Sequence, residues 1–398
     1  MTLPRERTVD WVKRLVRIDT TSREPNTPLI DVVAHELNRH GVTSTVLPAP
    51  RTGWANLMAT IPAADGTTSG GVVLSGHTDV VPVDGQDWDS DPFEVDIRDG
   101  LLYGRGSTDM KGFLACVLAA VPEMVAARLR EPVHLAFSYD EEVGCVGGAD
   151  LVRGLMASGA QPRAAIIGEP TSMRAVLAHK SVNIVEIEVV GLACHSSLAP
   201  HGVNALTHAA RIIGQIADLA ETYATAGPRD LDHEVPFSTI GVNVAHGGIA
   251  ANTVADRCVL LADFRTIEGH DPHEVLNQIK AIAAQQEELM QRQSSAARVR
   301  VRPLSMVPGL SSSASGAAAG LARDIGVVVD QAKVPYGTEA GQFAAAGIDA
   351  IVCGPGDIAQ AHGPNEYVPL EQLAACEQMI TSLLAHLTLP PEGTSASA

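Results

Sequence analysis

The chain has 398 residues, of which 45% are hydrophobic and 19% are charged, a composition typical of a globular protein and not of a disordered one. Because single hydrophobic cores rarely grow beyond about 250–300 residues, this length predicts two domains. A net charge of −18 disfavours binding to nucleic acids or to anionic membranes, since both require a basic surface.

The N-terminal sequence MTLPRERTVD lacks the apolar segment of a secretory signal, and no stretch of the chain has the roughly 18 apolar residues of a membrane span. Six cysteines are scattered without a CxxC pair, which disfavours both a disulfide framework and a zinc site made of cysteines. We therefore expect reduced thiols and a cytoplasmic location.

The first third of the chain alternates helical and strand patterns. The expected elements are helices over 28–41 and 109–129 and strands over 71–79, 132–142 and 163–170. Asp109 is expected to be the N-cap of its helix, and Pro122 is expected to kink that helix. Strands that alternate with helices predict a mostly parallel sheet covered by helices.

The pattern changes between residues 181 and 304, where the strands alternate apolar and polar residues as in a sheet covered on one face. The expected elements are a strand at 181–191, a helix at 204–223, strands at 238–248 and 256–266, a helix at 272–292 and a strand at 298–307. This β-α-β-β-α-β order is that of a ferredoxin-like α+β module.

The α/β pattern returns in the last third of the chain. Helices are expected around 317–325 and 341–346 and from residue 370 on, with apolar runs at 327–334 and 349–354 between them. The tail at 390–398 is expected to have no regular structure. The sequence thus predicts an α/β domain made of residues 1–180 and 305–398, with a second domain of residues 181–304 inserted into it.

Residues that could bind a metal ion stand where the predicted strands end. His77, Glu142 and Glu169 each close an apolar run, and sites in open α/β sheets form at the carboxyl ends of the strands. Asp109 follows a glycine-rich turn, and His362 follows a strand and a loop. Five nitrogen and oxygen ligands without sulfur suit a pair of zinc or similar divalent ions, with one carboxylate bridging both.

Two spacings refine this hypothesis. His77 and Asp79 are two residues apart at a strand end and therefore point the same way, so Asp79 is expected to accept a hydrogen bond from a metal-bound imidazole. Glu141 and Glu142 are adjacent and point apart on an extended backbone. One of them can bind metal while the other faces the attacking water.

Each of these residues, taken alone, is more often a surface or core residue than a ligand. Other motifs give no competing site. The acidic run at 84–94 is not a calcium loop, because Pro92 stands where the tight turn needs glycine and Arg98 where the bidentate glutamate belongs. There is no GxSxG, no HExxH and no GxGxxG after an early strand, which disfavours a serine hydrolase, a zincin and a dinucleotide-dependent dehydrogenase.

Ten segments that follow one another in the chain carry a resemblance to a known family. They are SGHTDVVPVDG, LYGRGSTDMKGF, YDEEVGCVGG, IIGEPTS, HKS, CHSSLAPHGVNA, HGGIAANTVAD, DFR, YGTEAGQF and CGPGDIAQAHGPNEYV. Together they resemble the zinc amidohydrolase family that includes acetylornithine deacetylase, succinyl-diaminopimelate desuccinylase, aminoacylase and glutamate carboxypeptidase. The matching segments span residues 54–371.

The resemblance implies a role for each ligand. It implies two Zn²⁺ per subunit, with Co²⁺ as a substitute. His77 and Glu169 would hold one ion, Glu142 and His362 the other, and Asp109 would bridge them.

The resemblance also implies which residues act on the substrate. Glu141 would be the general base, and Asp79 would orient the His77 ring. His195 would reach the active site of the partner subunit and stabilise the oxyanion there. Asn252 and Arg265 would hold the substrate carboxylate.

The fold that the resemblance implies is a catalytic α/β domain with an inserted lid that also forms a homodimer. Glu339 would read a cationic substrate side chain, with a dipole-stabilised carboxylate at a helix N-terminus as the alternative.

The resemblance is greatest to the acetylornithine deacetylases, because Glu169 and the segment YGTEAGQF match that branch. It implies that a small N-acyl amino acid is hydrolysed: N-acetyl-L-ornithine gives L-ornithine and acetate, in arginine biosynthesis. A desuccinylase, a glutamate-type carboxypeptidase, a broad N-acyl-amino-acid hydrolase and a catalytically silent binding protein on the same scaffold remain open.

Overall fold

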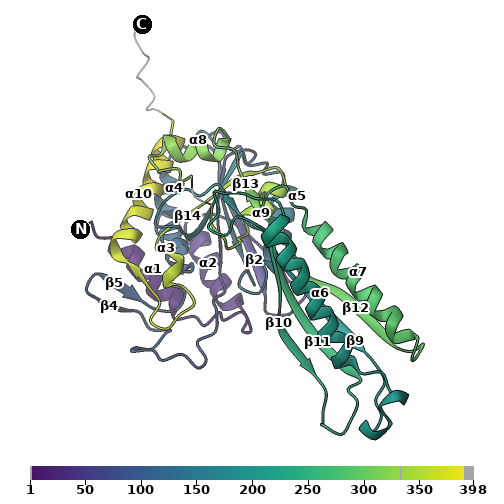
Figure 1. The fold of residues 1–398 in the computed structure, drawn as a ribbon. Helices are drawn as coiled ribbons and strands as arrows, with labels where there is room; N and C mark the ends of the chain where they lie inside the picture. The colour runs from purple at the N-terminus through teal and green to yellow at the C-terminus, as the bar shows by residue number, and fades with distance from the viewer. Residues whose placement is uncertain (1, 332, 390–398) are drawn as a thin grey trace, which may run out of the picture. The chain divides into compact units, whose positions relative to one another are not determined.

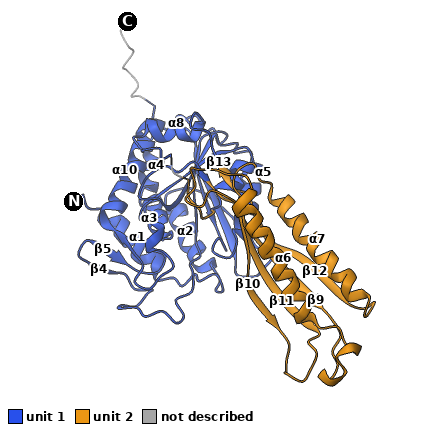
Figure 2. Cartoon of the chain, viewed as in Figure 1, with its two compact units in different colours: residues 1–178, 311–332, 338–398 blue, residues 179–310, 333–337 orange. Residues whose placement is uncertain are grey.

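The computed structural model describes residues 2–331 and 333–389, so the tail at 390–398 lies outside the described residues. The chain divides into two compact units (Figure 2). Unit 1 consists of residues 1–178, 311–332 and 338–398, and unit 2 consists of residues 179–310 and 333–337. The short segments 305–310 and 333–337 therefore group with unit 2, whereas the sequence pattern assigned them to the first domain.

Unit 1 is built around a six-stranded sheet, of which β2 and β14 are labelled in Figure 1. Its strand order is β1-β2-β6-β3-β7-β14. The strands are β1 (Ser44–Pro48), β2 (Ala55–Ile61), β3 (Val72–His77), β6 (Val133–Ser138), β7 (Ala164–Pro170) and β14 (Asp349–Gly354). Strands β6, β3, β7 and β14 run parallel, and β1 and β2 pair antiparallel at one edge. Every residue of β3, β6 and β7 is buried, because helices cover both faces of such a sheet. The predicted α/β fold class is confirmed.

The helices of unit 1 pack around this sheet. They are α1 (Glu6–Val16), α2 (Thr27–Arg39), α3 (Lys111–Ala119), α4 (Val121–Ala126), α5 (Val146–Ala157), α8 (Ala317–Asp324), α9 (Ala340–Ala345) and α10 (Leu370–Leu387). Helix α3 is buried along its whole length and packs against α1, α10, β3 and β7. A small sheet joins β15 (Tyr367–Pro369), β5 (Leu101–Tyr103) and β4 (Asp96–Arg98), and a short 3₁₀ helix spans Ile358–Gln360.

Three expectations for unit 1 were wrong. The helix predicted over 109–129 is two helices that break at Ala120, so the disturbance expected at Pro122 is confirmed but the single continuous helix is not, because proline is tolerated in a first turn and not in a helix interior. Asp109 is not an N-cap, since α3 begins at Lys111 and the Asp109 side chain contacts two histidines instead. The described residues of 327–334 form isolated bridges and no strand, and residue 332 lies outside the description.

Unit 2 is a four-stranded antiparallel sheet with the order β10-β11-β9-β12, and helices α6 and α7 pack against it (Figure 1). Its elements are β9 (Val182–Val190), the 3₁₀ helix Ser196–His201, α6 (Ala205–Ala226), β10 (Thr239–Gly247), β11 (Arg257–Arg265), α7 (Pro272–Gln291) and β12 (Arg298–Val307). Burial alternates along β9 and β11, as expected for a sheet covered on one face. The connectivity and strand order are ferredoxin-like.

The two-residue strands β8 (Ala178–His179) and β13 (Leu310–Ser311) pair with each other. Among the helices that the structure describes, none is long and apolar enough to cross a membrane.

Candidate metal centre

Three neighbouring strands of unit 1 bring the candidate ligands to one edge of the sheet. His77 is the last residue of β3, Glu169 lies near the end of β7, and Glu141 and Glu142 follow β6. Because β6, β3 and β7 are adjacent and parallel, their carboxyl ends meet at the same edge.

A glycine precedes each of the two strand-borne ligands and lets α3 pack close beneath them. A Cβ on Gly76 would lie 2.4 Å from the Cε atom of Met110, and one on Gly168 would lie 2.0 Å from a ring carbon of Phe113. A larger residue at 168 would collide with the Phe113 ring of α3, whereas one at 76 would displace the flexible end of the Met110 side chain just before α3. The two glycines therefore leave the space in which Met110 and Phe113 pack beneath the ligands.

The carboxylate of Asp109 lies between two histidines. Its Oδ1 atom is 2.9 Å from Nε2 of His77, and its Oδ2 atom is 3.1 Å from Nε2 of His362. The His77 Nε2 atom is also 3.6 Å from Oε1 of Glu169, and the His362 Nε2 atom is 3.1 Å from Oε2 of Glu142. We call His77 with Glu169 the inner half of the centre and His362 with Glu142 the outer half, with Asp109 shared.

The two halves differ in exposure and in backbone conformation. The His77 side chain is 1% exposed, whereas that of His362 is 54% exposed. His362 has φ 65°, and Asp140 and Cys145, on either side of the two adjacent glutamates, have φ 51° and 50°. Side chains with a Cβ rarely adopt this left-handed region, and such residues concentrate at functional sites.

Asp79 holds the centre together in a way that the sequence did not predict. The Nδ1 atom of His77 is 2.9 Å from the backbone oxygen of Asp79 and 3.6 Å from its Oδ1 atom. The Asp79 carboxylate accepts hydrogen bonds from the backbone N–H groups of Glu141 and Glu142, at 3.0 and 3.2 Å, and from the hydroxyl of Ser22 at 2.8 Å. Asp79 therefore positions the turn that carries both glutamates.

Glu141 lies beside the inner half. It offers a carboxylate oxygen that, with ligand atoms of His77 and Glu169, forms a group within 4.8 Å of one another. The Cys145 thiol donates a hydrogen bond to Oε1 of Glu141 at 3.1 Å. Burial, and then the charge of Glu169, raises the pKa of Glu141 well above its usual range. A carboxylate with a raised pKa suits a group that takes up a proton.

The carboxylates around the two histidines raise the pKa of both imidazole rings. Burial alone would lower the pKa of His77, but the charge of Glu169 and the hydrogen bond with Asp109 outweigh it and raise that pKa well above its usual range. Hydrogen bonds with Asp109 and Glu142 raise the pKa of His362 to about 11. Burial, and then the charge of Asp109, raises the pKa of Glu142 to about 7. The surrounding carboxylates thus favour the protonated form of both rings when no metal ion is bound.

The donor set fits a pair of divalent metal ions. It consists of two imidazoles and three carboxylates, which are ligands that zinc accepts. Ligand atoms of His77, Asp109 and Glu142 form a second group within 4.8 Å of one another. The Oε1 atom of Glu142 is buried and has no hydrogen-bond partner among the described residues, so it is available to a metal ion.

Glu339 is buried in unit 1 close to these carboxylates. It is 1% exposed and directly precedes α9, but it makes no capping hydrogen bond. A Cβ on Gly148 of α5 would lie 2.7 Å from its Oε1 atom, which has no partner within the described parts of the chain. Burial raises the pKa of Glu339 to about 7.

The three remaining candidates lie in unit 2. His195 and Asn252 are exposed neighbours, because the backbone N–H of Ser196 donates to the backbone oxygen of Asn252 at 2.9 Å. Arg265 ends β11 (Arg257–Arg265), at the other end of the strand from Asn252. The nine residues of β11 extend over about 27 Å. A single copy of unit 2 therefore does not bring Asn252 and Arg265 to one carboxylate.

The sequence analysis did not single out Glu366, Arg105 or Cys145. Glu366 and Arg105 are 1% and 0% exposed and lie next to the turn of Asp109. In the sequence, Glu366 and Arg105 could be noticed only because they lie in the segments HGPNEYV and YGRGSTD, since their local pattern is that of ordinary charged residues.

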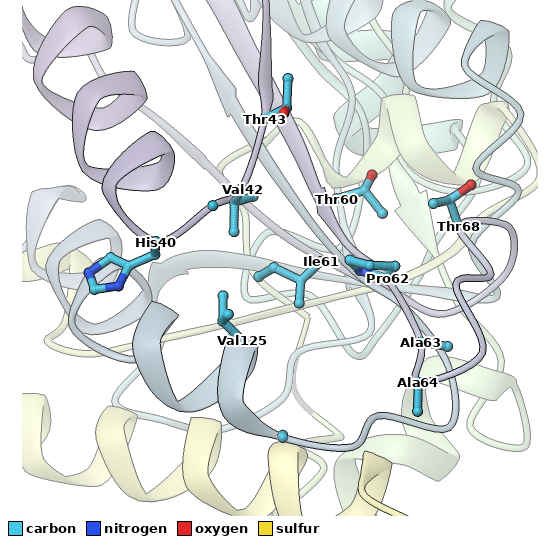
Figure 3. Close-up of a pocket in the computed structure, with 12 residues that line it drawn as sticks. His40, Val42, Thr43, Thr60, Ile61, Pro62, Ala63, Ala64, Thr68 and Val125 are labelled. Carbon is cyan, nitrogen blue, oxygen red and sulfur yellow. The ribbon is translucent and has the colours of Figure 1, made fainter.

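Unit 1 also contains a pocket of about 460 Å³ away from these residues (Figure 3). Val42, Ile61 and Val125 line it, from the segment after α2, the end of β2 and α4. None of its lining residues belongs to the metal centre, so it contributes nothing to the chemistry described here.

Comparison with known sequences identifies the family of the chain. The sequence profile described as Peptidase family M20/M25/M40 matches residues 73–386, a range that contains the whole metal centre. The chain belongs to this peptidase family. It is 35% identical over 379 residues to an acetylornithine deacetylase from Myxococcus xanthus. The alignment covers 94% of this chain and 95% of the relative.

Solved structures of the family share the fold. An M20 family metallo-carboxypeptidase from Sulfolobus solfataricus is 18% identical, with a TM-score of 0.75 over 96% of this chain and 99% of its own. A dinuclear metal-binding peptidase of the family from Bacillus subtilis has a TM-score of 0.63 at 14% identity, over 96% of this chain and 98% of its own. These structures show the shared fold, and the family match together with the 35% identical relative makes the chain a metal-dependent hydrolase of amide bonds.

Proposed function

We propose that this M20-family hydrolase removes the acetyl group from N-acetyl-L-ornithine and releases L-ornithine and acetate, a step of arginine biosynthesis. The observation that carries the proposal is the Asp109 carboxylate, whose two oxygens contact one histidine each beside Glu141. The 35% identity to the acetylornithine deacetylase of Myxococcus xanthus supports the choice of substrate.

Two Zn²⁺ ions per subunit fit this centre, with Co²⁺ as a substitute. His77 and Glu169 would hold one ion, Glu142 and His362 the other, and Asp109 both. When bound, such ions polarise the amide carbonyl and acidify water at neutral pH.

Glu141 moves the proton. Its carboxylate takes a proton from the attacking water and returns it to the nitrogen of the leaving amine. The backbone N–H of Glu141 is fixed by Asp79 and its Oε1 atom by Cys145, so the base is oriented before substrate binds. Such positioning reduces the entropic cost of reaching the transition state.

Residues of unit 2 complete the proposal. His195 donates a hydrogen bond to the oxyanion, and Asn252 and Arg265 hold the substrate carboxylate, which the planar guanidinium can bind through two hydrogen bonds. Because Asn252 and Arg265 lie at opposite ends of β11, both can act on one substrate only if they come from different copies. We therefore include in the proposal a homodimer formed through unit 2.

Glu339 is assigned to the substrate side chain. Its buried carboxylate oxygen without a partner would accept the cationic amine of ornithine. The Glu339→Gln variant should raise KM for N-acetyl-L-ornithine by at least about tenfold, because a charged hydrogen bond contributes about 1.5–3 kcal/mol. For the uncharged N-acetyl-L-citrulline, KM should change much less, and equal changes for both substrates would refute this role.

The proposed function is tested by amine release from a panel of substrates. Zinc-loaded protein is incubated with N-acetyl-L-ornithine, N-acetyl-L-citrulline and N-succinyl-diaminopimelate, each with a chelated control. We expect a strong preference for N-acetyl-L-ornithine and no turnover after chelation. Preference for another substrate would overturn the substrate assignment, and no turnover of any with both ions bound would indicate a silent relative.

The proposal also includes a cytoplasmic homodimer. Sedimentation of the full chain should give about twice the mass of 41.6 kDa. Fractionation of the source cells should recover the chain with cytoplasmic enzymes. A stable monomer with full activity would refute the dimeric active site.

A further inference from the structure

A buried carboxylate outside the metal centre holds the turn that carries Asp109. Glu366 is 1% exposed. Its Oε1 atom accepts hydrogen bonds from the backbone N–H groups of Thr108 and Asp109, at 2.9 and 3.1 Å. Its Oε2 atom accepts from the backbone N–H of Gly106 at 3.0 Å and from the Arg105 guanidinium at 2.7 Å. Four donors thus converge on one carboxylate.

Arg105 extends this network to the other side of the centre. Its side chain is 1% exposed, and its Nη2 atom donates to Oε1 of Gln86 at 2.6 Å. The amide nitrogen of Gln86 donates in turn to the backbone oxygen of His362 at 2.8 Å. A continuous chain of hydrogen bonds therefore joins Glu366, through Arg105 and Gln86, to the loop of His362.

The two halves of the centre depend on this network to different extents. The network fixes Asp109 and His362, which are two of the three ligands available to the outer half. The inner ligands His77 and Glu169 are positioned by the buried strands β3 and β7. We infer that Glu366 and Arg105 are positioning residues that set the affinity of the outer half for its metal ion.

The requirement is for a carboxylate and not merely for a polar group. In the Glu366→Gln variant one oxygen is replaced by an NH₂ group, which faces N–H donors and cannot accept from them. Arg105 would also lose its buried counter-charge. Both changes loosen the turn of Asp109 and the loop of His362, whereas His77 and Glu169 keep the positions that their strands give them.

This inference rests on the proposed two-ion centre, and the test uses the full chain. Zinc is titrated into chelator-stripped protein by calorimetry, and bound ions are counted by equilibrium dialysis. The wild type is expected to bind two ions. Glu366→Gln should bind the outer ion about 10–100-fold more weakly, the usual effect of removing a residue that supports a ligand. The inner ion shares only Asp109 with the network and should be weakened by a clearly smaller factor.

Two further variants sharpen the test. Gln86→Ala changes a half-buried side chain of the same network and should weaken the outer ion by a smaller factor. Glu377→Gln is the matched control, because Glu377 is another buried carboxylate of unit 1 that accepts from the backbone N–H of Arg5. It should leave both ions unchanged.

The outcomes separate this inference from the proposed function. A wild type that binds fewer than two ions contradicts the proposed centre itself. With two ions bound by the wild type, unchanged binding in Glu366→Gln, or equal weakening of both ions, overturns the inference alone. If Glu366→Gln does not fold, Gln86→Ala decides the question: it must weaken one ion only, and any other result overturns the inference.

Discussion

The inner and outer halves of the metal centre are built in different ways. His77 and Glu169 extend from two buried parallel strands, and the His77 side chain is 1% exposed. His362 stands in a loop with φ 65°, its side chain is 54% exposed, and hydrogen bonds from Gln86 and Arg105 hold its backbone. The sheet core therefore positions the inner ligands, while a network of polar side chains positions His362 and the shared Asp109.

This difference predicts different responses to substitution. A ligand on a buried strand is fixed by the packing of the whole domain, so changing it affects both stability and metal binding. A ligand on an exposed loop is fixed by a few hydrogen bonds, so changing it affects metal binding with little loss of stability. Both halves share Asp109, which couples them.

The largest expected effect distinguishes the adjacent glutamates. Glu141→Gln should lower kcat by about 10³-fold, since general base catalysis contributes about 10²–10⁴-fold, and should still bind two zinc ions. Glu142→Gln should lose the outer ion and recover part of its activity when excess zinc is added. Turnover and zinc counts on the two variants make the comparison. Near-normal turnover of Glu141→Gln would show that the base is misassigned.

The second prediction compares the two histidines in chelated protein. His77→Ala should lower the free energy of unfolding by about 3 kcal/mol, because it leaves the buried carboxylates of Asp109 and Glu169 without their counter-charge. His362→Ala should lower it by only about 1 kcal/mol, because the imidazole is 54% exposed and water can replace it beside Asp109 and Glu142. Urea denaturation measures both. Equal losses would contradict the distinction between the halves.

The sequence predicted the inner half better than the outer half for a physical reason. Strand-end residues such as His77 and Glu169 can be found from apolar runs, because the sheet places all strand ends together. His362 stands a whole loop after its strand, so the apolar run alone does not locate it, and its assignment to one of the two ions came from family resemblance. The network of Glu366, Arg105 and Gln86 joins residues far apart in the chain, which no local pattern reveals.

Local sequence patterns are limited in the same way when they are used to predict the fold. The ferredoxin-like order of unit 2 was predicted because its strands alternate clearly between apolar and polar residues. Helix α5 (Val146–Ala157) was not predicted, since Gly147 and Gly148 near its start are poor helix formers. The structure explains Gly148, because a Cβ there would lie 1.9 Å from Oε1 of Gln342. A long-range contact therefore overrides the local helix propensity.

The third prediction concerns the pH dependence of the metal-free protein. Burial, and then the charge of Asp109, raises the pKa of Glu142 from 4.5 to about 7 in the folded state, so the unfolded chain loses this proton first as the pH rises. The stability contributed by the bound proton is present below pH 4.5 and is lost as the pH rises to about 7. Burial alone would lower the pKa of His77 in the folded state, but the charge of Glu169 and the hydrogen bond with Asp109 raise it. The stability contributed by the proton on His77 is therefore also lost as the pH rises, at pH values above the usual pKa of histidine.

The melting temperature of chelated protein should therefore fall between pH 5 and pH 8. With saturating zinc it should instead rise or stay constant, because metal ions bind deprotonated ligands. Thermal melts at constant ionic strength measure both series. The Glu142→Gln variant cannot ionise at this position and should show a shallower fall without metal. A chelated protein that becomes more stable over this range would contradict the assignment.

The smallest expected effect tests how the inner half holds its base. The Cys145 thiol donates to Oε1 of Glu141 at 3.1 Å, and thiols are weak donors. Cys145→Ala should lower kcat about threefold to fivefold with KM and zinc content unchanged, because one modest hydrogen bond that orients the base is lost. Cys145→Ser keeps a donor and should restore most of kcat. Cys258→Ala, at a buried thiol of unit 2, is the control and should change neither parameter. An equal loss in the alanine and serine variants would show that the thiol acts by packing and not by orienting Glu141.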